Sequence, residues 1–327
     1  MGEFDLIRRF FTRPATAPGV ALGVGDDCAL LQPTPGMQWA ISSDMLVEGR
    51  HFFAGTDPQR LGHKALAVNL SDLAACGARP RGFTLALALP EADEAWLQAF
   101  SQGLLQLADA HHCPLVGGDT TRGPLNLCVT VFGEVPPGQA LLRSGARAGD
   151  DLYVSGHLGD ARLALEALLG RLRLPQALLP GAQQRLEQPT PRVALGLALR
   201  GIASSAIDVS DGLLGDLGHV LRASDVGATV DASTAINLIA VGAHPESAKC
   251  QFDSELLLQC ALAGGDDYEL LFTAPAALRS AVAQAAQTSG TSVTRIGRIE
   301  AEPGLRLVDA QGQALDAQRY ASFDHFG

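Results

Sequence analysis

An apolar run broken by glycines and adjacent carboxylates constrains this chain more than any other feature. Residues 22–31 read Leu-Gly-Val-Gly-Asp-Asp-Cys-Ala-Leu-Leu, and the apolar residues on both sides predict two short strands. Gly23 and Gly25 allow the backbone to turn tightly and to approach a ligand closely. Taken alone, the stretch fits a plain Gly-Asp turn. Asp26 and Asp27 are also the residue type that holds a cation at the end of a strand.

The same arrangement, an apolar strand that ends in small residues and an acid, recurs along the chain. A divided site is therefore expected, with contributions from both halves of the sequence. The recurrences are residues 38–44, which end in Ser42, Ser43 and Asp44; residues 113–121, which contain Gly118 and Asp119; residues 206–212, which contain Asp208, Ser210 and Asp211; and the Gly-Gly-Asp-Asp of residues 264–267.

A helix is predicted over residues 58–77, opening at a proline and closing before Gly77. Its residues are nearly all small or apolar, yet Asn69 and Asp72 lie three positions apart and so share one face. A carboxylate inside such a helix must be paired or bind a cation, because burying it alone is costly. Asp72 is therefore a candidate ligand.

Carboxylates gathered in one cleft repel each other unless cations are present. Ligands that offer only oxygen favour Mg²⁺ or Mn²⁺ over zinc, and Mg²⁺ held loosely by carboxylates commonly bridges to substrate phosphates. The sequence thus predicts an acidic cleft that receives a polyphosphate through several metal ions. The candidate aspartates are Asp27, Asp44, Asp72, Asp119, Asp208 and Asp211.

Several of these residues also suit simpler roles. Ser210 or Asp211 would serve equally well as the N-cap of the helix predicted over residues 213–222, although capping does not account for Asp208. His51 is either a substrate contact or an incidental loop residue. Burial of the carboxylates in ordinary salt bridges is a further alternative, but the 24 basic residues are spread along the chain.

Length and composition indicate two folded domains. A chain of 327 residues exceeds a typical single core, and 47% hydrophobic against 18% charged residues is enough to build two. The alternation of strands and helices predicts a mixed α/β (α+β) fold. Composition shifts to Pro, Gly and Arg over residues 136–150, so we expect domains at residues 1–137 and 138–327.

Charge and cysteine usage exclude several classes of protein. The net charge of −11, without a basic cluster, argues against nucleic acid as a partner. The six cysteines are scattered without a Cys-x-x-Cys pair, which favours buried, reduced thiols over structural zinc. The N-terminus carries acid where a signal peptide needs basic residues, and no apolar stretch reaches the roughly 20 residues of a membrane span. A cytoplasmic protein is expected.

The usual phosphate-binding loops are missing: the chain has no G-x-x-x-x-G-K-[ST], no kinase-type loop with H-R-D and no plausible nucleotide-binding G-x-G-x-x-G. Instead, six ordered motifs together resemble the thiamine-monophosphate kinase family. The likeness extends from Gly2 to Phe326 and so covers nearly the whole chain. The motifs are residues 25–29, 42–44, 67–74, 117–123, 207–213 and 264–270.

This resemblance implies ATP-dependent phosphorylation of thiamine monophosphate to thiamine diphosphate, the last step in making thiamine diphosphate. It also implies the two-domain aminoimidazole-ribonucleotide synthetase-like fold and a homodimer whose N-terminal strands combine into a barrel. By the same resemblance, the ligands of several Mg²⁺ ions would be Asp27, Ser42, Ser43, Asp44, Asp72, Asp119, Asp208 and Asp211, with Asp27, Asp72, Asp119 and Asp208 as the catalytic set. ATP would contact Gly118, Asp119, Arg143 and Ser210, and thiamine monophosphate would contact His51, Asp266 and Tyr320.

The chain departs from the family pattern at two places. The family usually has Glu where this chain has Asp266, and the shorter side chain reaches less far toward a substrate, so a water could mediate the contact. An aromatic residue near the C-terminus is expected to stack on the thiamine rings. We assign Tyr320, with Phe323 as the competing residue.

The expected reaction chemistry follows from the charge of the acceptor. The acceptor is already a phosphate oxyanion, so alignment and charge neutralisation suffice, and we expect direct in-line transfer without a phosphoenzyme.

Two alternative functions remain. The first is another enzyme of the superfamily. The chain lacks the reactive Cys and Lys of selenophosphate synthetases and the C-terminal cysteine of hydrogenase-maturation relatives, and its motifs fit aminoimidazole-ribonucleotide synthetase less well. The second alternative is a non-catalytic magnesium- or nucleotide-binding module.

Overall fold

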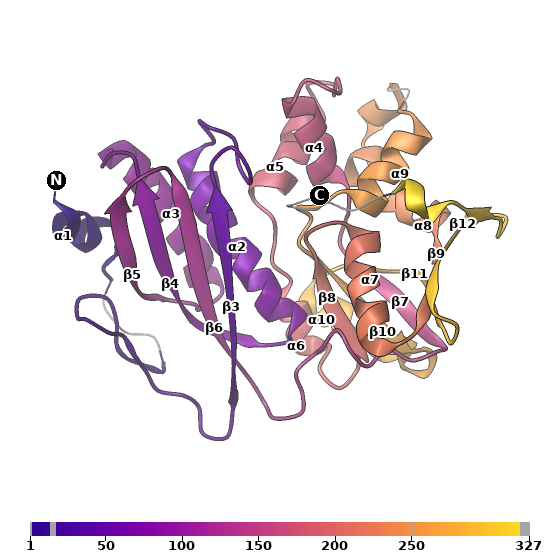
Figure 1. The fold of residues 1–327 in the computed structure, drawn as a ribbon, viewed down its shortest axis with the longest axis horizontal. Coiled ribbons are helices and arrows are strands. Elements are labelled where there is room, and N and C mark those ends of the chain that lie inside the picture. The colour runs from indigo at the N-terminus through magenta and orange to yellow at the C-terminus, as the bar shows by residue number, and fades with distance from the viewer. Residues whose placement is uncertain (1, 14–17, 250–251, 321–327) are drawn as a thin grey trace. The chain divides into compact units, whose positions relative to one another are not determined.

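The computed structural model describes residues 2–13, 18–249 and 252–320. The chain forms two compact units, Met1–Leu73 with Ala78–Ala140, and Ala74–Gly77 with Leu141–Gly327. We call them the N-terminal and the C-terminal unit. Both combine a sheet with helices (Figure 1), so the predicted mixed α/β class is confirmed.

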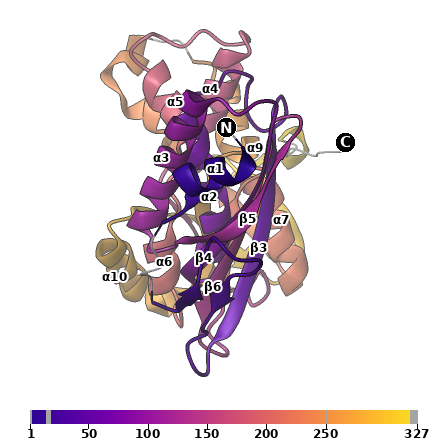
Figure 2. The same cartoon turned by 90° about the vertical axis from the view of Figure 1, so that its left-hand side faces the viewer.

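The N-terminal unit is built on a four-stranded sheet with β3 and β5 at its edges. Strands β4 and β5 run parallel, whereas β6 is antiparallel to both β3 and β4. Helices α2 and α3 pack on one face of this sheet, as two views at right angles show (Figures 1 and 2). In sheet order the strands are β3 (Gln38–Val47), β6 (Asn126–Val135), β4 (Arg79–Leu89) and β5 (Leu115–Arg122); the helices are α2 (Pro58–Ala75) and α3 (Glu94–Ala110).

One strand is longer than its sequence predicts. We expected a strand over residues 38–44, but β3 continues to Val47, whereas β5 (Leu115–Arg122) nearly coincides with the strand expected over residues 113–121. In β3 the two-residue alternation simply persists beyond Asp44, with Leu46 buried and Met45 exposed. Both aspartates therefore lie within strands, and their side-chain directions are set by the pleat rather than by a turn.

Helices α2 and α3 approach each other closely at two glycines. A Cβ at Gly62 would lie 2.1 Å from the carbonyl oxygen of Phe100, and a Cβ at Gly103 would lie 1.8 Å from that of Gln59. Helix α3 begins at Asp93, whose carboxylate accepts hydrogen bonds from two main-chain N–H groups of the first turn. This packing holds α2, and with it Asp72, against the sheet.

The first described residues form two short helical pieces. Helix α1 (Glu3–Leu6) is followed by a π-helical turn (Ile7–Phe11), in which Phe10 and Phe11 are buried. Phe11 packs edge-on against Phe100 of α3. The predicted strand-turn-strand around Asp27 is present as the hairpin of β1 (Val20–Leu22) and β2 (Leu30–Leu31).

The C-terminal unit contains a seven-stranded sheet that is antiparallel except for the pair β9–β12. Its strands in sheet order are β13 (Ala314–Leu315), β12 (Gly304–Val308), β9 (Gly227–Asp231), β11 (Val293–Glu300), β7 (Asp150–Ser155), β10 (Glu269–Pro275) and β8 (Ser205–Val209). Its helices are α4 (Asp160–Leu168), α5 (Leu179–Glu187), α6 (Val193–Ala198), α7 (Leu213–Ser224), α8 (Ala232–Ala235), α9 (Ser254–Ala263) and α10 (Arg279–Ser289).

Strands β7, β8 and β10 lie side by side and are buried along nearly their whole length. Helices α7 and α9 pack together beside them, and their apolar faces complete one core. The C-terminal end of β8 and the loop that leads from α9 into β10 therefore meet. Among the helices that the structure describes, none is long and apolar enough to cross a membrane.

Candidate active site

In the N-terminal unit, strand β3 and helix α2 bring three of the predicted ligands together. The Ser42 hydroxyl donates a hydrogen bond of 2.5 Å to Asp72 Oδ2. Two residues along the strand, the main-chain N–H of Asp44 donates to Asn69 Oδ1 at 3.0 Å. Asn69 is buried, and its amide in turn donates to the carbonyl of Ala65 within the helix. Asn69 therefore fixes the edge strand β3 to α2 beside Ser42 and Asp72.

Ser43 lies on the opposite face of the same strand. Its hydroxyl is 2.9 Å from Thr130 Oγ1 and donates to the carbonyl of Val129, both on the neighbouring strand β6. The alternation of side chains along a strand separates Ser43 from Ser42 and Asp44. Of the two predicted hydroxyl ligands, the structure brings only Ser42 to Asp72.

Asp27 lies in the exposed loop of the β1–β2 hairpin. Gly25 has a φ of +126°, a backbone conformation that favours glycine, and the Asp26 carboxylate accepts the main-chain N–H of Asp27 at 2.8 Å. This local hydrogen bond stabilises the turn, and the side chains of Asp26 and Asp27 are both exposed.

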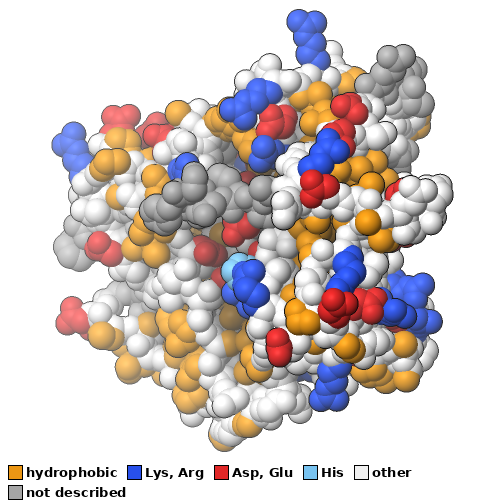
Figure 3. Space-filling model, turned by 45° about the vertical axis from the view of Figure 1, so that its right-hand side comes forward, with side chains coloured by type: hydrophobic (Ala, Val, Ile, Leu, Met, Phe, Trp, Pro, Cys, Tyr) orange, Lys and Arg blue, Asp and Glu red, His pale blue; other side chains and the backbone are white. Residues whose placement is uncertain are grey.

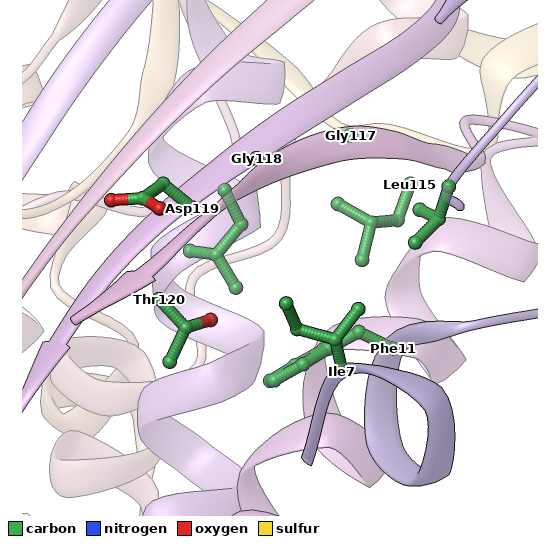
Figure 4. A pocket seen from close by; sticks show the side chains of 9 residues that line it. Ile7, Phe11, Leu115, Gly117, Gly118, Asp119 and Thr120 are labelled. Atoms are coloured by element: carbon green, nitrogen blue, oxygen red, sulfur yellow. The ribbon is translucent and has the colours of Figure 1, made fainter. Parts of the chain in front are cut away.

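Gly118 and Asp119 lie on the edge strand β5, next to a small pocket (Figure 4). Gly118 has a φ of +146°, and a Cβ there would lie 1.9 Å from the carbonyl oxygen of Leu85, so only glycine fits. The exposed carboxylate of Asp119 points away from Ile7 and Phe11, whose side chains form the apolar part of the pocket wall. Strand β5 thus presents a polar group and an apolar surface side by side.

His51 follows β3 in a turn that its own ring stabilises. Its Nδ1 accepts the main-chain N–H of Val47 at 3.0 Å. A neutral imidazole that accepts at Nδ1 carries its proton at Nε2, which makes Nε2 a donor suited to an anionic ligand. The buried Lys64 ammonium lies 3.5 Å from the His51 carbonyl and adds a positive charge nearby.

In the C-terminal unit, three predicted residues follow one another at the end of β8. Asp208 is buried in the strand, and Ser210 and Asp211 form the turn before α7. The N-cap of α7 is Gly212, without a side-chain cap. Capping by Ser210 or Asp211, the alternative that the sequence left open, is therefore not observed.

The turn is held by a residue that sequence analysis did not select. The carboxylate of Asp216 reaches back from the first turn of α7 and accepts the main-chain N–H groups of Ser210 and Asp211, at 3.0 and 3.1 Å. Asp216 is buried, and its burial raises the pKa of the carboxyl to about 7. Because Asp216 accepts these main-chain N–H groups, the side chains of Ser210 and Asp211 are not needed to stabilise the turn.

Asp266 lies in the loop between α9 and β10, in contact with the same turn. Its main-chain N–H donates to the carbonyl of Ser210 at 2.9 Å, and the Tyr268 N–H donates to that of Val209 at 2.8 Å. The Tyr268 hydroxyl donates to Asp266 Oδ1 at 3.3 Å. The structure thus brings the Gly-Gly-Asp-Asp stretch of residues 264–267 and the Asp208–Asp211 segment together within one unit.

Arg143 belongs to an exposed loop that is attached to the end of α7. The Ser224 hydroxyl donates to the Arg143 carbonyl at 3.2 Å, and it accepts the main-chain N–H groups of Gly145 and Ala146 at 3.1 Å each. Burial lowers the pKa of His219 on α7; the charges of Arg222 and Arg143 lower it further, and the charge of Asp211 acts in the opposite direction.

Tyr320 is placed differently from what stacking on a ligand requires. Its side chain is 5% exposed, belongs to the core of the C-terminal unit, and donates its hydroxyl to Glu255 Oε2 at 3.3 Å. In this position the ring packs against protein. The competing residue, Phe323, lies outside the described residues.

The donor set suits a hard cation, although it is dispersed. Within the described ranges, no three His, Cys, Asp or Glu side chains approach closely enough to hold a metal ion by themselves. Carboxylates and a serine hydroxyl are nevertheless the ligands that Mg²⁺ prefers, and Mg²⁺ is commonly bound by one or two carboxylates plus waters and substrate phosphates. The residues of β3 and α2, and those after β8, fit that type of binding.

Three buried acids outside the predicted ligand set form ion pairs with arginines. Arg185 and Arg192 pair with Glu269, Arg279 and Arg295 with Asp151, and Arg81 with Glu134. On the face shown in Figure 3, basic side chains are scattered among acidic, apolar and neutral ones.

Several residues that stabilise these segments were not selected from the sequence. They are the acids of the ion pairs (Glu134, Asp151 and Glu269) together with Asn69, Asp216 and Ser224. A polar residue within an apolar helix was the available signal for Asn69 and Asp216.

The comparisons with known proteins agree with this architecture. The family "AIR synthase related protein, N-terminal domain" matches residues 25–135, and "AIR synthase related protein, C-terminal domain" matches residues 147–310. Thiamine-monophosphate kinase of Escherichia coli K12 is 46% identical over 99% of this chain and 98% of its own length.

Solved structures give the same result. The crystal structure of thiamine-monophosphate kinase from Stenotrophomonas maltophilia K279a is 48% identical, with a TM-score of 0.85 over 96% of this chain and 98% of that one. The structure of AaThiL complexed with AMPPCP and TMP is 28% identical, with a TM-score of 0.75 over 90% of this chain and 89% of that one. The predicted two-domain synthetase-like fold is therefore confirmed.

Proposed function

The chain belongs to the thiamine-monophosphate kinase family of AIR synthase related proteins, and we propose that it transfers the terminal phosphoryl group of ATP to thiamine monophosphate, yielding thiamine diphosphate and ADP. The full-length identity of 46% to the Escherichia coli kinase carries this proposal. The related structure in complex with AMPPCP and TMP, an ATP analogue with the acceptor, supports the same pair of substrates.

We propose that each unit contributes oxygen donors for Mg²⁺. The proposed donors of the N-terminal unit are Asp27, Ser42, Asp44, Asp72 and Asp119, and those of the C-terminal unit are Asp208 and Asp211. The 2.5 Å bond between Ser42 and Asp72 and the backbone restraint of the 210–211 turn by Asp216 support this set. Bound Mg²⁺ would neutralise the polyphosphate charge. Ser43, also predicted as a ligand, has the weaker support, because its hydroxyl bonds to β6.

The protein's own part in the reaction is binding and alignment. ATP would contact Gly118, Asp119, Arg143 and Ser210, and the acceptor would contact His51 and Asp266. The backbone at residue 118 requires glycine because a Cβ would overlap the Leu85 carbonyl, so this glycine preserves the shape of the edge strand beside Asp119. The acceptor oxygen is already ionised, so no side chain has to remove a proton, and in-line transfer needs two anions aligned and their charge compensated. Tyr320 remains a candidate acceptor contact only if its ring leaves the core.

We further propose a homodimer formed through the N-terminal sheet. The face of β3 opposite α2 exposes Trp39, Ile41, Met45 and Val47, with Ile41 at 62% and Met45 at 56%. An apolar face of this kind on an edge strand favours association with a second copy.

The proposed location is the cytoplasm, where ATP is available and where the described free thiols stay reduced.

The test is ADP release from Mg²⁺-ATP by the purified full-length protein, with thiamine monophosphate, free thiamine or the precursor of aminoimidazole ribonucleotide as acceptor. Turnover with thiamine monophosphate alone, together with formation of thiamine diphosphate, is the expected result. Activity with another acceptor only would overturn the substrate assignment. Binding of nucleotide without turnover on any acceptor would favour the binding module.

A further inference from the structure

The loop that carries Asp266 has an unusual backbone. Asp266 has a φ of +66° and Tyr268 a φ of +51°, so two residues with side chains adopt the left-handed conformation within three positions. Such a conformation is disfavoured for L-residues with a Cβ, and it persists only where the surrounding structure determines it. The surroundings of residues 264–268 should therefore contain the groups that hold this loop.

One such group is the carboxylate of Asp267, which lies between the two left-handed residues. Asp267 is 0% exposed, and both of its oxygens lie 3.0 Å from the main-chain nitrogen of Gly159, at the start of α4. Burial raises the pKa of this carboxyl well above its usual range. A buried carboxyl that accepts from a helix start attaches the middle of the loop to a rigid element.

A second group is Arg185, which comes from α5. Its guanidinium donates to the carbonyl of Asp267 at 3.3 Å, to that of His157 at 3.4 Å and to Glu269 Oε1 at 2.8 Å. One side chain thus connects the loop, the turn after β7 and the first residue of β10.

Glu269 completes the arrangement. It is 0% exposed and accepts hydrogen bonds from the Ser155 hydroxyl at 2.6 Å and from Arg192 Nε at 2.6 Å, in addition to Arg185. Gly156, in the turn after β7, has a φ of +55°, and a Cβ there would lie 2.1 Å from the Glu269 carboxylate. Only glycine therefore leaves room for the Glu269 side chain against this turn. The loop is therefore held at its middle by Asp267 and at its end by Glu269, and Arg185 joins both.

We propose that Arg185, Asp267 and Glu269 are positioning residues that hold the 264–268 loop in the conformation in which Asp266 meets the acceptor, thiamine monophosphate. The proposal rests on the proposed role of Asp266 as an acceptor contact. None of the three residues needs to touch a substrate. Their loss frees the two left-handed residues to relax, which displaces the Asp266 carboxylate.

A purely structural role predicts a different pattern of effects. If the network served only stability, its loss would lower the melting temperature and leave the KM values of the surviving folded enzyme unchanged. A positioning role predicts a selective rise in the KM for thiamine monophosphate over the KM for ATP. The chain contains a control on another part of the same unit, because Arg279 pairs with the buried Asp151 at 2.6 Å, although the Arg279 side chain is 55% exposed and that of Arg185 only 18%.

The experiment measures the melting temperature and both KM values for the full-length protein with the substitutions Arg185→Met, Asp267→Ala, Asp267→Asn, Asp266→Ala and Arg279→Met. Arg185→Met and Asp267→Ala should raise the KM for thiamine monophosphate about fivefold or more while the KM for ATP changes less than about twofold. Asp267→Asn, which keeps an oxygen to accept from Gly159, should stay close to the parent enzyme. Arg279→Met should lower the melting temperature without moving either KM.

Unchanged KM values in Arg185→Met and Asp267→Ala, or an equal rise in both KM values, would overturn the positioning proposal. Asp266→Ala separates this failure from that of its premise: if that variant leaves the KM for thiamine monophosphate unchanged, the proposed role of Asp266 itself is wrong. Should Arg185→Met not fold, Arg185→Lys is judged by the same ratio, because lysine keeps the charge but lacks the planar fork that reaches three acceptors.

Discussion

The main-chain N–H of Asp266 donates a hydrogen bond of 2.9 Å to the carbonyl oxygen of Ser210. Gly265, the residue before Asp266, packs on the same oxygen so closely that a Cβ would lie 2.4 Å from it. Asp266 is a proposed acceptor contact, and Ser210 a proposed ATP contact. The two loops are therefore in direct contact at this carbonyl, and a group that overlaps it should displace both of them.

Gly265→Ala should raise the KM values for both ATP and thiamine monophosphate, because the added methyl group pushes the two loops apart. Steady-state kinetics with each substrate varied in turn measure this. Gly181→Ala is the matched control, since no atom lies within 4 Å of a Cβ built there. A rise in only one of the two KM values would contradict the coupling of the loops.

Asp72→Asn should lower kcat by about 10²–10³-fold, the loss seen when a preorganised electrostatic group is removed from an active site. The asparagine preserves volume and can still accept from Ser42, so folding should be retained and charge compensation lost. Turnover and melting temperature are measured over a range of Mg²⁺ concentrations. Near-normal turnover at moderate Mg²⁺ would remove Asp72 from the proposed metal site.

Ser42→Ala and Ser43→Ala form an internal comparison on neighbouring positions of β3. Ser42 bonds to Asp72, whereas Ser43 bonds across to β6, so Ser42→Ala should increase the Mg²⁺ concentration needed for half-maximal turnover and Ser43→Ala should not. A titration of activity with Mg²⁺ distinguishes the two. An equal increase in both variants would mean that both serines are ligands.

Gly118→Ala should weaken ATP use and lower stability together. Its φ of +146° disfavours any side chain, and the methyl group would overlap the Leu85 carbonyl. The KM for ATP and the melting temperature should both change. Gly123→Ala, where a Cβ meets the Ala88 Cβ at an ordinary 3.5 Å, is the control and should behave like the parent enzyme.

Asp216 should give stability an unusual dependence on pH. Its pKa is raised to about 7 in the folded chain, whereas that of an unfolded aspartate is about 3.9. Between these values the folded state binds the proton more tightly, so the contribution of Asp216 to the free energy of unfolding falls as pH rises from about 4 to about 7, and is constant above.

The comparison of the parent chain with Asp216→Asn isolates this effect. Urea unfolding without Mg²⁺ at about pH 5 and about pH 8 should show a larger loss of stability with rising pH in the parent chain than in the variant. The same loss in both would mean that the Asp216 carboxyl does not titrate in this range in the folded protein.

Local pattern was enough to predict the main elements of this chain. The apolar helix with Asp72, the buried strand before Asp208 and the hairpin around Asp27 all depend on neighbouring residues, because strand and helix periodicity and Gly-Asp turns are properties of short stretches. The six ordered motifs also identified the family, because each motif is a short run of consecutive residues.

The partners of the side chains depended on the tertiary structure. The pairing of β3 with β6 determines the hydrogen-bond partners of Ser43. The packing of α7 determines that Asp216, rather than Ser210 or Asp211, accepts the main-chain N–H groups of the turn. Arg185 and Glu269 are separated by 84 residues, and nothing local to either predicts their ion pair. The same holds for the burial of Tyr320 against Glu255.

By itself, the amino-acid sequence determined the fold class and the family and predicted the chemical type of the site, because periodicity and residue type are properties of each position along the chain. Only the tertiary structure decided which candidates meet, which backbone groups are satisfied and which carboxylates serve as anchors. The physical reason is that hydrogen bonds and burial are satisfied by whichever group the packing of distant segments brings into contact.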